Sequence, residues 1–250
     1  TSEGGFWHKR VYPHQMWLDG IYMGEPYYAQ YTATFDADNE AAYADIVNQF
    51  LLVAKRTYDK ETGLYRHAWD EIKALPWSDK SGRSAHVWGR ALGWYMMAIV
   101  DALDYLPQDQ PGRDKIITIL QGIVKNLAKY QDPQTGAWCQ VIDQTGREGN
   151  YLEMSCTPMY AYAIAKGVRK GYLDPSTLEM AKKAYQGILD NFIKVDEKGL
   201  VSLTRVCGVA GLGGKPYRDG SFEYYINEVI RDNDPKGVAP FIMLCIEMND

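Results

Sequence analysis

The sequence lacks the features that define several common classes of protein. It contains no run of about 18 apolar residues, so no segment is expected to span a membrane. Its four cysteines are far apart and form no Cys-x-x-Cys pair, which argues against a disulfide framework or a cysteine-based zinc site. The four histidines show no metal-binding spacing, and no phosphate-binding loop or GxSxG motif is present. We therefore expect neither a cofactor nor a catalytic metal.

The composition is that of a globular protein rich in aromatic residues. Of the 250 residues, 46% are hydrophobic, 24% are charged and 13% are aromatic. So many aromatic rings indicate either a large core or a groove that stacks on sugar rings. The formal net charge of -5 argues against a nucleic-acid partner. The first residues contain no apolar signal segment, so we expect a cytoplasmic protein.

Helical periodicity dominates the chain and predicts an all-α fold. Apolar residues recur at helical spacing in about eight segments, at 40–58, 91–103, 116–127, 178–192 and 238–248, and more weakly at 15–31, 152–171 and 222–231. Asn39 is placed to cap the first of these. The Asp174-Pro175 and Asp234-Pro235 pairs are typical helix starts.

A short motif recurs after three of these helices. The pattern Asp-x-x-Thr-Gly begins at Asp59 and at Asp132, and a shorter form begins at Asp196. Each copy follows a helix and precedes a short extended piece. A repeated unit of helix, decorated loop and helix is typical of stacked αα-hairpins. Such loops gathered at one end favour a closed α/α toroid with its site in the mouth.

Residues 4–20 form the densest group of candidate functional residues. Tyr12, His14 and Trp17 would suit a carbohydrate groove, although an irregular segment packed against helices is an equal alternative. Asp19 lies inside an apolar run, where a carboxylate needs a partner or has a raised pKa. A structural hydrogen bond to a helix end would explain Asp19 equally well.

Further candidates lie on loops later in the chain. Asp79 stands two residues from Trp77, and an aromatic wall would raise its pKa and make it a proton donor; the alternative is a simple Asx turn. His67, on the first decorated loop, would position substrate, relay a proton or serve only the fold. Arg147 and Arg218 would bind a sugar carboxylate through a bidentate contact, or form ordinary surface ion pairs.

Several blocks together resemble the unsaturated rhamnogalacturonyl hydrolases of glycoside hydrolase family 105. A more distant similarity links the chain to the unsaturated glucuronyl hydrolases of family 88. The resemblance rests on blocks that occur in the expected order: GGFWHKRVYPHQMWLDG, PWSD, VWGRALGWY, GNYLE, PYRDGSFEYY and KGVAPF.

The resemblance implies an (α/α)6 toroid that acts on pectin-derived oligosaccharides carrying a 4,5-unsaturated uronic acid at the non-reducing end. In this chemistry an Asp protonates C4 of the enol ether, water adds at C5, and the hemiketal falls apart to release a keto acid. The PW-x-D motif makes Asp79 the acid, and the LDG motif makes Asp19 its assistant. His67 and Trp77 match subsite positions, and Trp138, Gln140 and Arg147 are placed more loosely as sugar contacts.

Two other functions are also compatible with these residues. An inverting glycosidase would use Asp19 and Asp79 as base and acid. A non-catalytic carbohydrate-binding toroid would use neither. A complete (α/α)6 toroid has twelve helices, about four more than the helical periodicity of this sequence predicts. We therefore expect residues 1–250 to form one domain that is the C-terminal two-thirds of a longer one, or that pairs with a further N-terminal segment.

Overall fold

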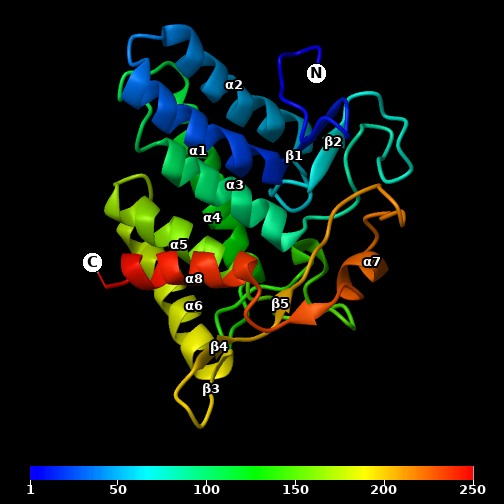
Figure 1. Ribbon diagram of the computed structural model, residues 1–250, viewed down its shortest axis with the longest axis vertical. Helices are drawn as coiled ribbons and strands as arrows, with labels where there is room; N and C mark the ends of the chain where they lie inside the picture. The colour runs from blue at the N-terminus through cyan, green and yellow to red at the C-terminus, as the bar shows by residue number, and fades with distance from the viewer. Residues whose placement is uncertain (250) are drawn as a thin grey trace.

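The computed structural model describes residues 1–249 and is built mainly of α-helices (Figure 1). The eight helices of the described residues are α1 Leu18–Phe35, α2 Glu40–Thr57, α3 Gly89–Ala102, α4 Arg113–Leu127, α5 Cys156–Arg169, α6 Leu178–Asn191, α7 Phe222–Ile226 and α8 Pro235–Glu247. Each segment with helical periodicity contains one of them, so the predicted all-α fold is confirmed. None of the helices in residues 1–249 has the length and apolar character needed to cross a membrane.

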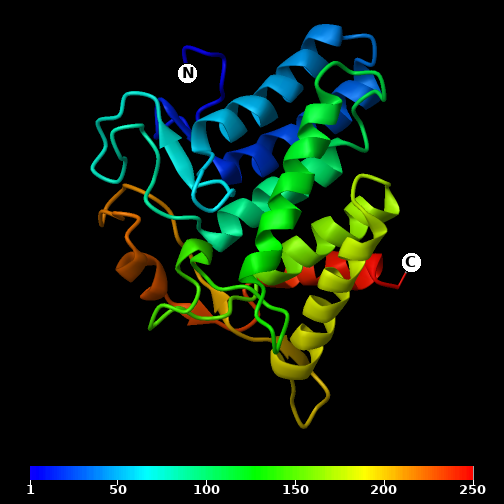
Figure 2. The ribbon, with the colours of Figure 1, turned by 180° about the vertical axis from the view of Figure 1, so that it is seen from behind.

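The helices form two layers. Helices α1, α3, α5 and α8 lie side by side in one layer, and α2, α4 and α6 lie behind them (Figures 1 and 2). Helix α3 packs between α1 and α5 and is almost entirely buried, with Leu92, Tyr95 and Ile99 in the core. The chain therefore alternates between the layers, as stacked αα-hairpins do.

The side chains predicted to cap helix N-termini form capping hydrogen bonds in the structure. The Asn39 side chain accepts a hydrogen bond from the Ala42 backbone N–H, and Asp234 accepts one from the N–H of Lys236. Asp174 caps a short 3-10 helix, Pro175–Thr177, and α6 follows it directly. Two further 3-10 helices lie at Ala128–Tyr130 and Ile142–Gln144.

The recurring motif forms the same turn at Asp59 and Asp132, and a turn one residue shorter at Asp196. The backbone N–H of the turn glycine donates to the carbonyl of Asp59, Asp132 or Asp196. Each glycine has a positive φ, as at Gly63 (+70°), where a Cβ atom would also lie 2.4 Å from Asn126 Nδ2. A larger residue at this position would therefore be strained and would clash.

Three small antiparallel sheets join the loops at one end of the helices. They pair β1 Gln15–Trp17 with β2 Ala68–Asp70, β3 Ile193–Val195 with β4 Val201–Leu203, and β5 Val206–Cys207 with β6 Ile230–Arg231. In the first pair Trp17 lies opposite Ala68, and the Leu18 N–H donates to the His67 carbonyl at 3.0 Å. This pairing brings the start of α1 against the first decorated loop.

Candidate active site

A cavity of about 310 Å³ opens where α1, α3 and α8 begin. All the helices of the first layer start at this end of the molecule, next to the loops (Figure 1). Their free backbone N–H groups and helix dipoles make such an end electropositive. Thirteen residues line the cavity: His8, Lys9, Tyr12, Trp17, Asp19, Met23, Trp88, Arg90, Trp94, Val209, Ala210, Arg218 and Lys236.

Stacked rings form one wall of this cavity. The ring centroids of His8 and Trp17 are 4.2 Å apart with an angle of 3° between the planes, and Tyr12 stacks on Trp17 at 5.1 Å. Burial lowers the pKa of His8 to about 4, although the Asp19 charge opposes this shift. His8 is therefore neutral near pH 7, and the wall presents flat apolar faces of the kind on which sugar rings stack.

Asp19 is held at the base of the cavity by a buried histidine. His67 Nε2 lies 3.1 Å from Asp19 Oδ2, in a contact that is not aligned as a regular hydrogen bond. On the other side of the ring, His67 Nδ1 lies 2.7 Å from the Tyr225 hydroxyl. His67 is completely buried, whereas part of the Asp19 side chain is exposed. The three groups form a continuous polar chain from the core to the cavity.

The charge of Asp19 depends on this arrangement. Burial raises the pKa of the Asp19 carboxyl, but His67 lowers it by its charge and by hydrogen bonding, and the net pKa lies below the ordinary value. Asp19 is therefore ionised when the cavity contains only solvent. Among the residues that line this cavity it is the sole carboxylate.

Basic side chains surround Asp19, and they differ in how their charges are balanced. Arg90 is buried and lies 3.6 Å from Glu153, and Lys236 pairs with Asp234 at 2.6 Å. Arg218 instead donates to neutral oxygens, from Nε to the Gly213 carbonyl and from Nη2 to the Tyr12 hydroxyl, both at 2.8 Å.

Arg218 makes no ion pair among residues 1–249. A Cβ atom on Gly211 would come within 2.7 Å of its Nη1 atom, so the loop leaves room for this guanidinium. The cavity therefore contains a positive charge without a protein counter-charge, a suitable site for a carboxylate.

A second cavity, of about 510 Å³, borders the first. Trp77 and His14 line this second cavity rather than the first, and Tyr12 lines both. His14 Nδ1 lies 3.0 Å from Glu71 Oε2. The predicted site residues Tyr12, His14, Trp17, Asp19 and Trp77 thus lie on two adjoining cavities, and His67 stands behind Asp19.

The expected raised pKa of Asp79 is wrong. Although burial raises this pKa, hydrogen bonds from Ser81 and from the Arg83 backbone N–H outweigh burial and lower it. Asp79 Oδ1 accepts hydrogen bonds from the Ser81 N–H at 2.7 Å and from its hydroxyl. The side chain is 39% exposed and lines neither cavity. Asp79 thus forms the turn that was the alternative interpretation.

Three other expected sugar contacts lie in the core or on the surface. Trp138 is completely buried in the core, where its Nε1 donates to the Leu127 carbonyl at 3.0 Å. Gln140 is completely buried and donates to Cys207 Sγ and the Tyr225 carbonyl. Arg147 lies on the surface, where it pairs with Glu223 and covers the Phe222 ring at 3.9 Å. None of the three lines the cavity of Asp19.

Several residues of the cavity escaped sequence reasoning. Trp88, Arg90 and Trp94 come from the start of α3, and Lys236 from the start of α8. Two features of the sequence point to these residues. Trp88, Arg90 and Trp94 fall within the VWGRALGWY block, and Lys236 follows a predicted helix cap. Arg90 is buried within α3, where it donates to the Ser155 hydroxyl and the Cys207 carbonyl.

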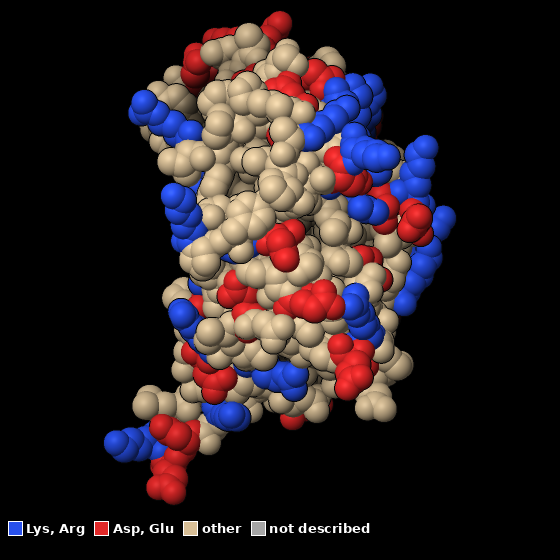
Figure 3. Space-filling model, turned by 90° about the vertical axis from the view of Figure 1, so that its right-hand side faces the viewer, with Lys and Arg blue, Asp and Glu red and all other residues tan. Residues whose placement is uncertain are grey.

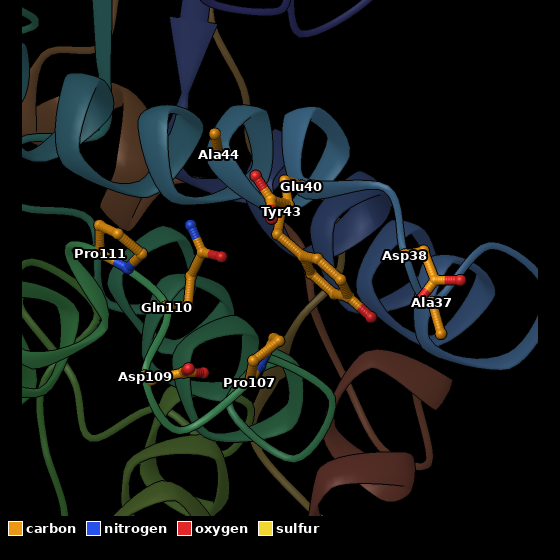
Figure 4. A pocket seen from close by; sticks show the side chains of 9 residues that line it. All are labelled: Ala37, Asp38, Glu40, Tyr43, Ala44, Pro107, Asp109, Gln110 and Pro111. Carbon is orange, nitrogen blue, oxygen red and sulfur yellow. The ribbon is translucent and has the colours of Figure 1, made fainter.

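Other parts of the surface fit an anionic sugar less well. Figure 4 shows a cavity of about 620 Å³ between the α1–α2 and α3–α4 connections, lined by the acidic residues Asp38, Glu40 and Asp109. Its lining residues follow the C-terminal ends of α1 and α3, whereas Asp19 lies at the start of α1. On the loop-bearing side, uncharged side chains cover most of the upper half, with charged side chains of both signs along its margins (Figure 3). Within residues 1–249, no His, Cys, Asp or Glu cluster is arranged to hold a metal ion.

The sequence and the fold are those of a sugar-cleaving enzyme family. Residues 1–250 match the model of Glycosyl Hydrolase Family 88, and the chain belongs to this family. It is a glycoside hydrolase similar to unsaturated uronyl hydrolases, with the all-α toroid fold that solved unsaturated glucuronyl hydrolases share.

Individual relatives agree with this membership. A solved family 105 glycoside hydrolase of C. acetobutylicum ATCC 824 is 48% identical, with a TM-score of 0.96, over 100% of this chain and 69% of its own. Protein Atu3128 of Agrobacterium fabrum is 36% identical over 90% of this chain and 97% of its own. The unsaturated rhamnogalacturonyl hydrolase YesR of Bacillus subtilis is 29% identical, over 77% of this chain and 50% of its own.

Proposed function

We propose that the protein releases a 4,5-unsaturated uronic acid from the non-reducing end of pectin-derived rhamnogalacturonan oligosaccharides. The observation that carries the proposal is the pairing of Asp19 with buried His67 at a cavity whose Arg218 has no counter-charge. The uronate carboxylate would bind Arg218, and the flat ring of the unsaturated sugar would stack against the wall of His8 and Tyr12, whose rings cover Trp17. The name of the Bacillus relative supports this substrate class.

The chemistry requires one group that gives and then takes a proton. In the proposed reaction, Asp19 beside His67 takes up a proton when an anionic sugar enters and displaces water, because both changes favour the neutral carboxyl. Asp19 then protonates C4 of the enol ether. The Asp19 carboxylate accepts a proton from the water that adds at C5, which restores the pair. The hemiketal opens to a C5 ketone, and the C1 hemiacetal releases the leaving sugar.

The alternative of an inverting glycosidase is less well supported. That reaction uses two carboxyl groups about 6.5–9.5 Å apart on either side of the anomeric carbon. Asp19 is the sole carboxylate among the lining residues of its cavity, and Asp79 is bound within its own turn. A hydration that uses a single carboxyl group fits these residues better.

A pair of variants tests the proposal. Lyase-digested rhamnogalacturonan is incubated with the protein, and the ultraviolet absorbance of the enol ether is followed. We expect Asp19→Asn to lower the rate by about 10²–10⁴-fold, because it removes the general acid and base. Asp79→Asn is the matched control and should retain the rate within about threefold.

The opposite pattern, with Asp79→Asn inactive and Asp19→Asn active, would overturn the assignment to Asp19. Wild-type protein that binds the oligosaccharide without consuming the enol ether would support a carbohydrate-binding role instead.

A further inference from the structure

The imidazole ring of His67 is fixed in its orientation by the residues around it. Its carbonyl accepts a hydrogen bond from the Leu18 N–H at 3.0 Å, which ties it to the start of α1. The rings of Trp17 and Trp88 pack against the imidazole, with centroids 5.1 and 4.7 Å from its own. The imidazole, which is completely buried, therefore keeps Nε2 toward Asp19 and Nδ1 toward the core.

On the core side, the hydroxyl of Tyr225 is the hydrogen-bonding partner of this ring. Tyr225 lies on α7, is completely buried and stacks on Trp88 with an angle of 16° between the ring planes. Its hydroxyl oxygen lies 2.7 Å from His67 Nδ1 and makes no other hydrogen bond among residues 1–249. Tyr225 lines neither cavity, so it acts on Asp19 through His67.

A count of donors and acceptors decides the direction of this hydrogen bond when the imidazole is neutral. The hydroxyl has one proton, and a neutral imidazole has one proton on either nitrogen. If Nδ1 carried that proton and donated it to Tyr225, the buried hydroxyl proton would have no acceptor. If Nε2 carries it, the hydroxyl donates to Nδ1 and the Nε2–H group faces the Asp19 carboxylate. The second arrangement is favoured, because an unpaired buried donor is costly.

We propose that Tyr225 is a positioning residue: its hydroxyl donates to Nδ1 of neutral His67, and the His67 proton therefore stays on Nε2, facing Asp19. The catalytic consequence rests on the proposed function. The Nε2–H group stabilises the Asp19 carboxylate that remains after C4 has received its proton, and the hydroxyl strengthens this contact by polarising the ring. Without the hydroxyl, Asp19 holds its proton more tightly and is a weaker acid.

A pair of conservative variants tests the proposal. Tyr225→Phe keeps the buried ring and removes only the hydroxyl. Tyr95→Phe is the matched control, because Tyr95 is also completely buried and its hydroxyl donates to the Phe50 carbonyl at 2.8 Å, outside both cavities. Each variant loses one buried hydrogen bond, so a general loss of stability would affect both alike.

Nitrogen nuclear magnetic resonance of the labelled protein without substrate reads the proton position. The ring signals of His67 are identified by their absence in His67→Gln and are followed as pH rises until the ring is neutral. In the wild type and in Tyr95→Phe we expect Nε2 to be protonated and Nδ1 to be an unprotonated acceptor. In Tyr225→Phe the Nδ1 signal should move, because this nitrogen has lost its donor. A protonated Nδ1 in the neutral wild-type ring, or an Nδ1 signal unchanged in Tyr225→Phe, would overturn the proposal.

The surrounding charges are the same in both variants. The ionisable side chains that line the cavity with Asp19 are His8, Lys9, Tyr12, Arg90, Arg218 and Lys236. Those whose charges act on Tyr225 from the core side are Asp143, Asp219 and Tyr224. Neither substitution removes any of them, so a difference between the two pH profiles reports the Tyr225 hydroxyl.

The pH dependence of kcat on lyase-digested rhamnogalacturonan tests the catalytic consequence. On the basic side, kcat falls where Asp19 in the complex loses the proton that it must donate. For Tyr225→Phe we expect this limb to move to higher pH by about 0.5–1 unit, the equivalent of one hydrogen bond, with a lower plateau and an unchanged KM. Tyr95→Phe should keep the wild-type profile.

Two results separate this inference from the proposed reaction. An unmoved basic limb in Tyr225→Phe, or an equal shift in both variants, would overturn the positioning role of Tyr225 while leaving the reaction in place. If the nitrogen signals are as expected but the wild-type protein does not consume the enol ether, the proposed reaction is wrong and the hydrogen bond from Tyr225 to His67 stands.

Discussion

Glu25 provides a sharp test of the helix packing. It lies on α1 and is only 1% exposed, and its Oε2 atom has no hydrogen-bond partner in residues 1–249. Burial, assisted by the Asp45 charge, raises the pKa of its carboxyl to about 8. In the unfolded chain the pKa returns to the ordinary value of 4.5. The folded protein therefore retains a proton that the unfolded chain loses between these two pH values.

The sign and size of the effect follow from proton linkage. Because the folded state binds more protons between pH 4.5 and 8, the free energy of unfolding falls as pH rises, by about 1.4 kcal/mol per pH unit. Glu25→Gln keeps the shape of the neutral carboxyl and removes the titration. Relative to the wild type, the variant should gain about 3 kcal/mol between pH 5 and pH 7.

Urea unfolding at pH 5, 6 and 7 measures this difference. Glu61→Gln, at an exposed turn, is the control and should follow the wild-type pH dependence. Parallel curves for Glu25→Gln and the wild type across the three pH values would refute the argument, because they would mean that Glu25 ionises normally in the folded state.

Three other predictions concern the two cavities and the core. Arg218→Gln should raise KM for the anionic substrate by about 10- to 100-fold in steady-state kinetics, and an unchanged KM would exclude Arg218 as the carboxylate site. Gly211→Ala should also raise KM, because the new Cβ atom would lie 2.7 Å from Arg218 Nη1 and would displace the guanidinium. A crystal structure of this variant with Arg218 unmoved would contradict the prediction. Trp138→Phe should lower the free energy of unfolding by about 1–3 kcal/mol and leave KM unchanged, because the Trp138 contact to Leu127 is structural. A raised KM with full stability would restore a role for Trp138 in binding.

The fold was predictable because its signals are local. A period of 3.6 residues marks each long helix, and Asn39 and Asp234 cap helices through atoms within three residues of themselves. The Asp-x-x-Thr-Gly turn is equally local, since its hydrogen bonds run from Thr62 and Gly63 back to Asp59. Interactions of this range are encoded in short stretches of sequence.

The arrangement of the site was less predictable because it depends on contacts distant in sequence. The neighbour of Asp19 is His67, and only the pairing of β1 with β2 brings them together. The closeness of Trp77 in sequence predicts a raised pKa for Asp79, whereas the Asp79 carboxylate turns toward backbone N–H groups. Trp138 similarly follows a decorated loop but points into the core. The direction of a loop side chain is set by tertiary packing.

The central claim is that water adds to the enol ether before the glycosidic bond breaks. Nuclear magnetic resonance in real time follows the vinyl proton at C4 and the reducing end of the released sugar in one sample. The account predicts that the vinyl signal is lost no later than the new reducing end forms, and that Asp19→Asn stops both changes. A released uronic acid that still carries its vinyl proton would contradict the account, because it would show direct cleavage at the anomeric carbon.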